Sequence, residues 1–265
     1  MVHKARKKGL PFSSKLRQSV KDHLVVAFED FQQLGNVTIR PMKAISATSD
    51  MHEDICSSAE NKQAAMVILP YHKEQRLDGT LETIRCDYED INQRVVEHAP
   101  CSVGILVDRG LGGRIHLSGS RFYCTVTVLH FGGKDDNEAL AYGARMAEHP
   151  GINLRVVHFI MDADAAIDQH AVTIINESIL AETVLNNKSI HYEERKIRNV
   201  AEIVSIVREY SGCNLFVVGR NPEPLVGLTL SGISNSPELG LVGSLLTSSD
   251  FLTASVLVVQ QPQHH

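Results

Sequence analysis

The amino-acid sequence predicts an α/β fold with parallel sheets, organised as two related halves. Segments with apolar residues at every third or fourth position, typical of amphipathic helices, alternate with short continuous apolar runs. Such runs are typical of strands buried on both faces of a parallel sheet. In addition, residues 67–70 (VILP) recur as 216–219 (FVVG), and 105–107 (ILV) recur as 256–258 (VLV), both about 150 residues further on. The sequence therefore predicts an internal duplication.

The first half is expected to alternate helices and strands from residue 20 onward. The elements, in order, are a helix at 20–34, a strand at 37–40, a helix at 51–62, a strand at 66–70, a loop at 73–87, a helix at 88–99 and a strand at 103–107. Gly35 ends the first helix, and the loop is polar and contains the turn-forming pair Asp78–Gly79. Pro100 disfavours a helical conformation at Ala99 and has no N–H, so a new strand begins there.

After a glycine-rich connector, the second half is expected to repeat this pattern in longer form. Strands are predicted at 122–131, 153–160, 189–196, 215–219 and 255–260, and helices at 137–149, 167–185, 200–210 and 236–249. Such alternation is typical of a doubly wound parallel sheet. We therefore place a first domain at residues 1–110, a linker at 111–120 and a second, complete domain at 121–261. The first domain is expected to lack its opening strand, helix and second strand, and the chain to be a fragment.

Composition and charge exclude some classes of function. The net charge of -5 and the isoelectric point near 6.2 argue against nucleic acid as a partner, because phosphate binding needs clustered positive charge. Residues 1–21 are the exception, because their only charged residues are Lys and Arg. This segment is expected either to contact an acidic lipid surface or acidic protein, or to be an ordinary solvated basic face. Five scattered cysteines indicate a reducing compartment, and no apolar run is long enough to span a bilayer.

Specific stretches of the sequence resemble known families. Both halves resemble universal stress protein domains, which are small five-stranded α/β units, as in residues 98–101 (HAPC) followed by a terminal apolar strand. A narrower resemblance is to the cytosolic C-terminal region of the plant cation/proton exchanger (CHX) family of monovalent-cation/proton antiporters. The residues that carry it are 1–12 (MVHKARKKGLPF), 38–42 (TIRPM), 51–56 (MHEDIC), 66–73 (MVILPYHK), 92–110 (NQRVVEHAPCSVGILVDRG) and 131–141 (FGGKDDNEALA).

This resemblance implies that the chain is the cytosolic regulatory region of a monovalent cation (K+)/proton antiporter that takes part in ion and pH homeostasis. The upstream membrane domain of the same polypeptide, in the plasma membrane or an endomembrane, would hold the residues that bind and couple the ions. A homodimer is expected. The alternative is a stand-alone nucleotide-binding universal stress protein. No catalytic motif is present, so the chain is not expected to be an enzyme, although the fold alone does not exclude small-molecule catalysis.

The candidate ligand site lies where open α/β sheets bind ligands, outside the carboxyl ends of the strands at the point where their order reverses. The resemblance to stress proteins implies the strand order 3-2-1-4-5, which puts this point between strands one and four of the second domain. The residues there are Gly132, Gly133, Lys134, Gly219 and Arg220, with Gly243 and Ser244 from the following helix. Glycines allow close approach of the backbone, and the two cations would bind a phosphate, so the candidate ligand is a nucleotide.

Two features count against this nucleotide prediction. Nucleotide-binding stress proteins carry the pattern G-x2-G-x9-G-[ST], whereas here only Gly243–Ser244 matches, with Leu230 and Ile233 in place of the earlier glycines. Pro237 is expected at the first turn of the helix, which would put Gly243 inside the helix and away from its phosphate-binding start. The alternative role of the glycines is in tight turns and close packing. The same strand order implies that residues 37–45 and 66–70 do not pair.

The 13 histidines suggest a further hypothesis. They are dispersed, with no HExxH motif and no Cys/His cluster, so no metal site is predicted. A pH response suits a domain that regulates proton exchange, because histidine titrates near neutrality. The alternative is that these are ordinary surface histidines or buried histidines with satisfied hydrogen bonds.

Overall fold

The computed structural model describes residues 38–40, 42, 44–76, 79–111, 123–161, 190–222, 236–248 and 253–263. The chain divides into two compact units, Met1–Ile45 and Ser46–His265, and the elements described below belong to the second. The helices predicted at 20–34 and 167–185, the basic segment 1–21 and most of the linker at 111–120 lie outside the described residues.

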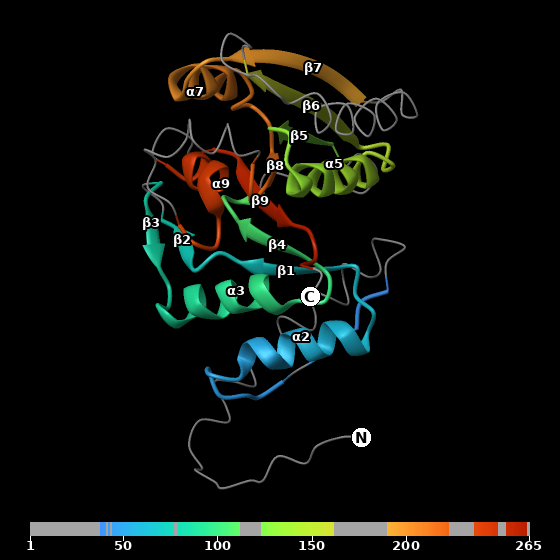
Figure 1. Ribbon diagram of the computed structural model, residues 1–265, viewed down its shortest axis with the longest axis vertical. Coiled ribbons are helices and arrows are strands. Elements are labelled where there is room, and N and C mark those ends of the chain that lie inside the picture. The colour runs from blue at the N-terminus through green and yellow to red at the C-terminus, as the bar shows by residue number, and fades with distance from the viewer. Residues whose placement is uncertain are drawn as a thin grey trace, which may run out of the picture. The chain divides into compact units, whose positions relative to one another are not determined.

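The first half contributes two helices, two strands of the main sheet and a small hairpin (Figure 1). Its elements are α2 (Met51–Asn61), β1 (Met66–Pro70), β2 (Lys73–Gln75), β3 (Leu81–Thr83), α3 (Asp87–His98) and β4 (Ser102–Val107). The helix-to-strand joint at Pro100 is confirmed, since Ala99 is already extended with φ -65° and ψ 137°. The continuous apolar runs at 66–70 and 103–107 are confirmed as neighbouring parallel strands.

The second half contributes five strands and three helices among the described residues. Its elements are β5 (Cys124–His130), α5 (Lys134–Met146), β6 (Ile152–Met161), β7 (Ile190–Ile197), α7 (Val200–Glu209), β8 (Leu215–Gly219), α9 (Gly240–Leu246) and β9 (Ser255–Gln260). These strands are mutually parallel and lie in the order β7-β6-β5-β8-β9. The predicted order 3-2-1-4-5 is therefore confirmed.

The two halves share one sheet, which the sequence did not predict. The described strands run in the order β1-β4-β9-β8-β5-β6-β7, and β4 pairs antiparallel with β9 (Figure 1). Ile105 faces Val258 at the centre of this pairing, with Gly104 opposite Val259 on one side and Leu106 opposite Leu257 on the other. The halves are therefore related by a local two-fold axis at Ile105 and Val258.

Helices cover both faces of this sheet. One apolar core contains side chains of α2, α3, α7 and α9, and the core on the opposite face contains side chains of α5. In the second half Val126, Val128 and Val217 belong to the α5 core, whereas Val218 and Val258 belong to the other. Because successive residues of a strand point to opposite faces, continuous apolar runs are needed to fill both cores.

Three predictions about elements of the chain are wrong. Residues 38–40 are not in a strand, because they have no ladder partner among the described residues. The predicted loop at 73–87 contains the antiparallel hairpin β2–β3, which turns at Gly79 with φ 87°. The helix predicted from Ser236 begins only at Gly240, because Leu239 N and Gly240 N both donate to Ser236 O in a preceding turn.

Two further expectations can be compared with the strand pairing. β1 pairs only with β4 among the described residues, so the prediction that residues 37–45 and 66–70 do not pair is confirmed for the described part of the chain. The recurrence of 105–107 as 256–258 is displaced by two residues in the structure, where Ile105 corresponds to Val258. The domain boundary at 111–120 stays a prediction.

Candidate functional site

Five of the predicted ligand-site residues meet at the carboxyl ends of β5 and β8. Gly132 and Gly133 join β5 to α5, Lys134 is the first residue of α5 and is exposed, and Gly219 and Arg220 end β8. Gly132 has φ 92°, a left-handed conformation that favours glycine. The sequence correctly placed these residues because parallel strands bring their carboxyl ends to one edge of the sheet.

The carboxylate of Asp136 lies among these residues, at the carboxyl ends of β5 and β8. It accepts hydrogen bonds from the backbone N–H groups of Phe131 (3.1 Å), Gly133 (3.0 Å) and Gly219 (3.0 Å). Burial raises the pKa of the Asp136 carboxyl to about 7, even though these three N–H groups favour its charged form. The Asp136 carboxyl group therefore takes the backbone N–H donors at the place where a phosphate was predicted.

A second buried carboxylate, that of Asp135, closes the neighbouring turn. It accepts hydrogen bonds from Asn221 N (3.1 Å), Asn221 Nδ2 (2.7 Å) and Gln261 N (3.0 Å). Burial raises its pKa, and these hydrogen bonds oppose the rise. Because both carboxylates are buried side by side, they hold the β5–α5 turn against the ends of β8 and β9.

The glycines at this edge are required by close packing. A Cβ atom on Gly219 would lie 2.5 Å from Asp136 N, and one on Gly133 would lie 2.4 Å from Asn221 O. Arg220 is also engaged, since Nη1 donates to Gln260 Oε1 (2.7 Å) and Nη2 donates to Pro237 O. Of the two cations predicted to hold a phosphate, Arg220 is thus already bonded within the protein, whereas Lys134 is exposed. Nucleotide binding here stays a prediction.

Gly243 and Ser244 lie inside α9 as predicted, although the helix begins at Gly240 and Pro237 lies in the turn before it. A Cβ atom on Gly243 would lie 2.6 Å from Val258 Cγ2, so this glycine lets α9 pack closely on β9. Ser244 Oγ accepts a hydrogen bond from Ser236 N (2.8 Å). Both residues therefore have packing or local hydrogen-bonding roles within the second half.

A buried polar cluster, which was not predicted from the sequence, joins the two halves. His72 follows β1, Asn92 lies on α3, and Glu238 precedes α9 in the other half. His72 is 3% exposed and Glu238 is 0% exposed. His72 Nδ1 contacts Glu238 Oε1 directly, and Asn92 Nδ2 donates to Glu238 Oε2 (2.6 Å) and to Pro70 O (2.9 Å). We call His72, Asn92 and Glu238 the inter-half cluster.

Burial changes the acidity of one group in the inter-half cluster. It raises the pKa of Glu238, although the hydrogen bonds of Glu238 to Asn92 and His72 oppose the rise. Two other residues adjoin His72: the Glu89 carboxylate lies 3.9 Å from His72 Nε2, and the Tyr71 ring packs edge-on against the His72 ring at 4.5 Å. Gain or loss of a proton at Glu238 would therefore change the charge at this junction.

The same cluster contains potential metal ligands. Three potential ligand atoms lie within 4.8 Å of one another, one each from His72, Glu89 and Glu238. No metal site was predicted, because the histidines show no metal-binding motif. His72 and Glu238 are 166 residues apart and meet only in the fold. However, Nδ1 of His72 is directed at Glu238 and the second oxygen of Glu238 at Asn92, so these groups satisfy each other without an ion.

Two other histidines lie side by side on adjacent strands. His130 on β5 is fully buried, and its ring centroid is 5.1 Å from that of His158 on β6. His130 Nε2 bonds to Asn137 Oδ1 (3.0 Å), and His158 Nδ1 bonds to the Tyr192 hydroxyl (3.0 Å). Burial lowers the pKa of His130, so this imidazole is held neutral. The neutral imidazole of His130 does not fit the pH-sensor hypothesis. Its Nδ1 has no hydrogen-bond partner among the described residues, so the alternative of a fully satisfied buried histidine does not fit it either.

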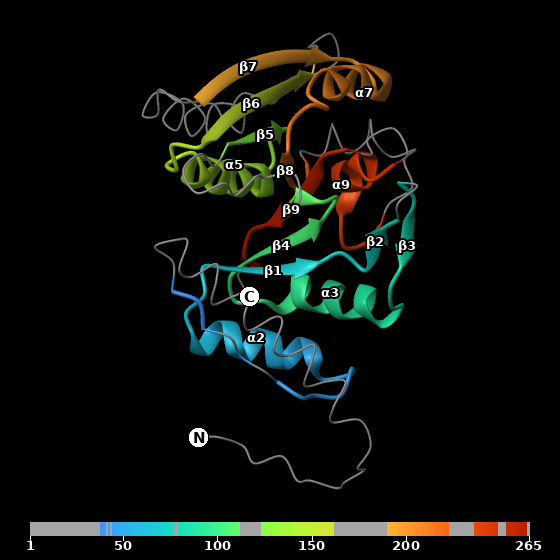
Figure 2. The same ribbon diagram turned by 180° about the vertical axis from the view of Figure 1, so that it is seen from behind.

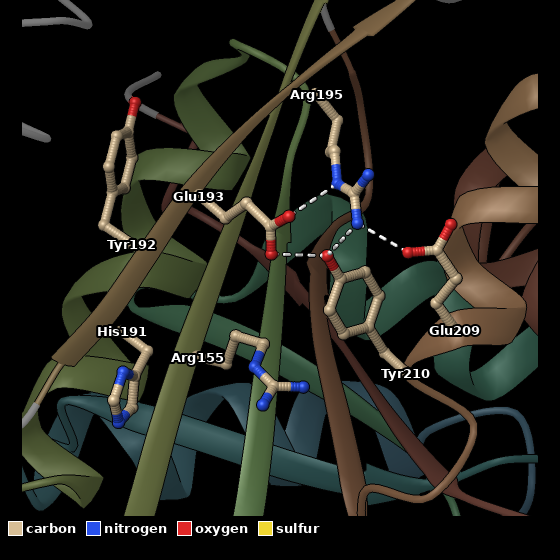
Figure 3. A pocket seen from close by; sticks show the side chains of 7 residues that line it. All are labelled: Arg155, His191, Tyr192, Glu193, Arg195, Glu209 and Tyr210. Atoms are coloured by element: carbon tan, nitrogen blue, oxygen red, sulfur yellow. Dashed lines mark hydrogen bonds and ion pairs between the residues drawn. The ribbon is translucent and has the colours of Figure 1, made fainter.

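A surface pocket lies on β6, β7 and the end of α7 (Figure 3). Arg195 is paired there with Glu193 (2.7 Å), Glu209 (2.5 Å) and the Tyr210 hydroxyl (3.2 Å), and Arg155 lies over the Tyr210 ring. Two arginines and two glutamates line the pocket, and Arg195 is paired with both glutamates. The charged side chains of the pocket are therefore held largely by one another.

Comparisons with known proteins point to one family. A model described as the plant cation/H(+) antiporter domain matches residues 1–111, and one described as the plant cation/H(+) antiporter, C-terminal domain, matches residues 123–260. The chain is similar to cation/H(+) antiporters 17 and 18 of Arabidopsis thaliana, at 47% and 48% identity over 98% of its length. It spans only 36% and 35% of those relatives.

Solved structures show a similar fold. A universal stress protein from Archaeoglobus fulgidus DSM 4304 matches with a TM-score of 0.50 and 16% identity, covering 97% of this chain and 82% of that one. At this identity the likeness extends to the fold alone. Among the described residues, none of the helices combines the length and apolar character needed to cross a bilayer.

Proposed function

Because the chain belongs to the plant cation/H(+) antiporter family, we propose that it is the cytosolic regulatory region of a monovalent cation (K+)/proton antiporter. Transport would be carried out by a membrane domain of the same polypeptide, and the chain described here would adjust that transport for ion and pH homeostasis. The similarity to much longer antiporters supports this division of labour. We infer no catalytic role, since the described clusters are closed on themselves by hydrogen bonds.

The observation that carries a regulatory role is the inter-half cluster. A regulatory region must make contacts that differ between two states of the protein, and the effector must favour one state. His72, Asn92 and Glu238 form a contact of this kind, because they bind the two halves together through a buried carboxyl group whose pKa is raised by burial. We therefore propose that cytosolic protons are the effector. Protons are also one of the ions named in the family's description.

The direction of the pH effect follows from the raised pKa of Glu238. A carboxyl whose pKa is raised in the folded state stabilises that state fully below its unfolded pKa, and this stabilisation is lost as the pH rises through the folded pKa. The junction between the halves should therefore be tighter at lower cytosolic pH and looser at higher pH.

The test is ion exchange by the full-length antiporter in vesicles from yeast cells that lack their own K+/H+ exchangers. We expect Glu238→Gln to change the dependence of K+/H+ exchange on cytosolic-side pH while the protein amount in the vesicles stays the same. Glu82→Gln is the matched control, because Glu82 pairs with Arg76 on an exposed hairpin. An unchanged pH profile for Glu238→Gln would reject protons at this cluster as the effector. Unaltered exchange after deletion of residues 46–265 would reject the regulatory role itself.

A further inference from the structure

The edge of the sheet at β1 differs from the equivalent position in the second half. The described elements of the first half, α2–β1–α3–β4, correspond to α7–β8–α9–β9, because β1 and β8 both pair in parallel with the strand at the two-fold axis. β8 is an inner strand with β5 on its other side. β1 is the outermost strand of the sheet among the described residues, as Figure 2 shows from behind.

The backbone of β1 has free ladder positions on its outer side. Tyr71 N donates to Leu106 O on β4. Because backbone N–H and C=O groups alternate in direction along a strand, those of Leu69 and Val67 also point to β4. The N–H and C=O groups of Met66 and Ile68 therefore point to the outer side. Neither has a ladder partner on that side among the described residues. These groups are a template for a further strand.

Proline at position 70 fits a parallel strand on this edge. Pro70 also faces outward and has no N–H, which ordinarily excludes proline from inner strands. Its counterpart Gly219 does not donate to β5, because Gly219 N is bonded to the Asp136 carboxylate instead. The position of Pro70 is thus one at which an added strand would require no ladder donor.

Side chains on the same edge are exposed where their counterparts are covered. Ile68 is 56% exposed, whereas its counterpart Val217 is 0% exposed. Val217 has β5 beside its strand and belongs to the core that contains side chains of α5. Met66 is half-buried, and its counterpart Leu215 is 6% exposed. A half-exposed isoleucine on a short edge strand leaves apolar surface in contact with water. Burying that surface would stabilise the protein by roughly 25 cal/mol for each Å². One strand and one helix cover this surface in the second half.

We propose that the outer edge of β1 and the face around Ile68 bind a strand–helix unit equivalent to β5–α5, supplied by a part of the same polypeptide outside this chain. The added strand would run parallel to β1, and its helix would cover Ile68. The relatives support a source in the same polypeptide, since the chain spans only 36% of antiporter 17. This proposal does not depend on the regulatory role, because it concerns how the first half is completed.

Hydrogen exchange at the Ile68 amide tests the proposal. We expect exchange at this amide to be at least about tenfold slower in the full-length protein than in the present chain, because a ladder bond forms there. Equal exchange rates in the two proteins would overturn the proposal. The proposal would also be overturned if the Ile68 amide of the present chain exchanged more slowly at higher protein concentration while the chain formed dimers. A second copy would then occupy the edge.

A pair of matched variants gives an independent readout. Ile68→Asp should leave the melting temperature of the present chain unchanged and lower that of the full-length protein's cytosolic unfolding transition. Ile84→Asp is the control, because Ile84 is similarly exposed (49%) but follows the hairpin strand β3. Equal effects of the two substitutions in the full-length protein would contradict an occupied face at Ile68.

Discussion

Replacing Glu238 by alanine should weaken the junction between the halves more than any substitution of an exposed ion pair. The change leaves His72 Nδ1 and Asn92 Nδ2 without their acceptor in a buried site. A buried donor left without its acceptor costs about 1–3 kcal/mol, and two donors lose theirs here, whereas exposed ion pairs contribute about 0–1 kcal/mol. We therefore expect the free energy of unfolding to fall by about 2–5 kcal/mol for Glu238→Ala. Glu82→Ala, in the exposed Arg76–Glu82 pair, should cost at most about 1 kcal/mol.

The assay is urea unfolding of both variants and of a double-mutant cycle with His72→Ala. If the two residues act through their mutual contact, the costs of His72→Ala and Glu238→Ala should not add, with an interaction energy of about 0.5–3 kcal/mol. The urea dependence of the free energy should stay constant, so that the midpoint reports stability. Additive costs, or a Glu238→Ala cost no larger than that of Glu82→Ala, would refute the reasoning that this contact joins the halves.

Three further predictions concern the crevice at β5 and β8. Asp136→Asn should destabilise the chain by about 1–3 kcal/mol, because an amide has one acceptor for three N–H groups. It should also flatten the decline in melting temperature as pH rises towards 7, where the raised pKa of Asp136 otherwise costs stability, and an unchanged slope would count against the prediction. Gly219→Ala should cost about 1–3 kcal/mol by overpacking against Asp136, whereas Gly212→Ala, with open space around it, should be close to neutral, and equal effects would contradict the packing argument. Millimolar ATP should leave the melting temperature unchanged; a rise that Lys134→Ala removes would instead support nucleotide binding, since a ligand at 100 times its Kd adds about 2.7 kcal/mol.

The strand order of the second half could be predicted because its signals are local. Runs such as that in β8 are apolar on both faces, so the sequence itself indicates a buried parallel strand between helices. The meeting of Gly132, Lys134 and Gly219 followed from the same order. Asp135 and Asp136 were not among the predicted site residues. Their positions depend on bonds to Asn221 and Gly219, which come from another part of the sequence.

The features missed by the sequence prediction depend on non-local contacts. The β4–β9 pairing is set by complementarity between two apolar strands, and neither strand alone indicates its partner. His72 and Glu238 appear as unremarkable polar residues until the fold brings them together. The hairpin β2–β3 was taken for a loop because its residues are mostly polar and partly exposed, so no alternating apolar pattern marks it.

The antiparallel pairing of β4 with β9 joins two halves of one covalent chain, which are therefore always present in equal amounts. Two separate subunits joined at such an edge would dissociate on dilution and exchange with related proteins, but tethered halves do neither. The extent of this pairing therefore does not depend on protein concentration. A second copy of this chain would have to bind elsewhere, because the strand edges at the two-fold axis are already occupied.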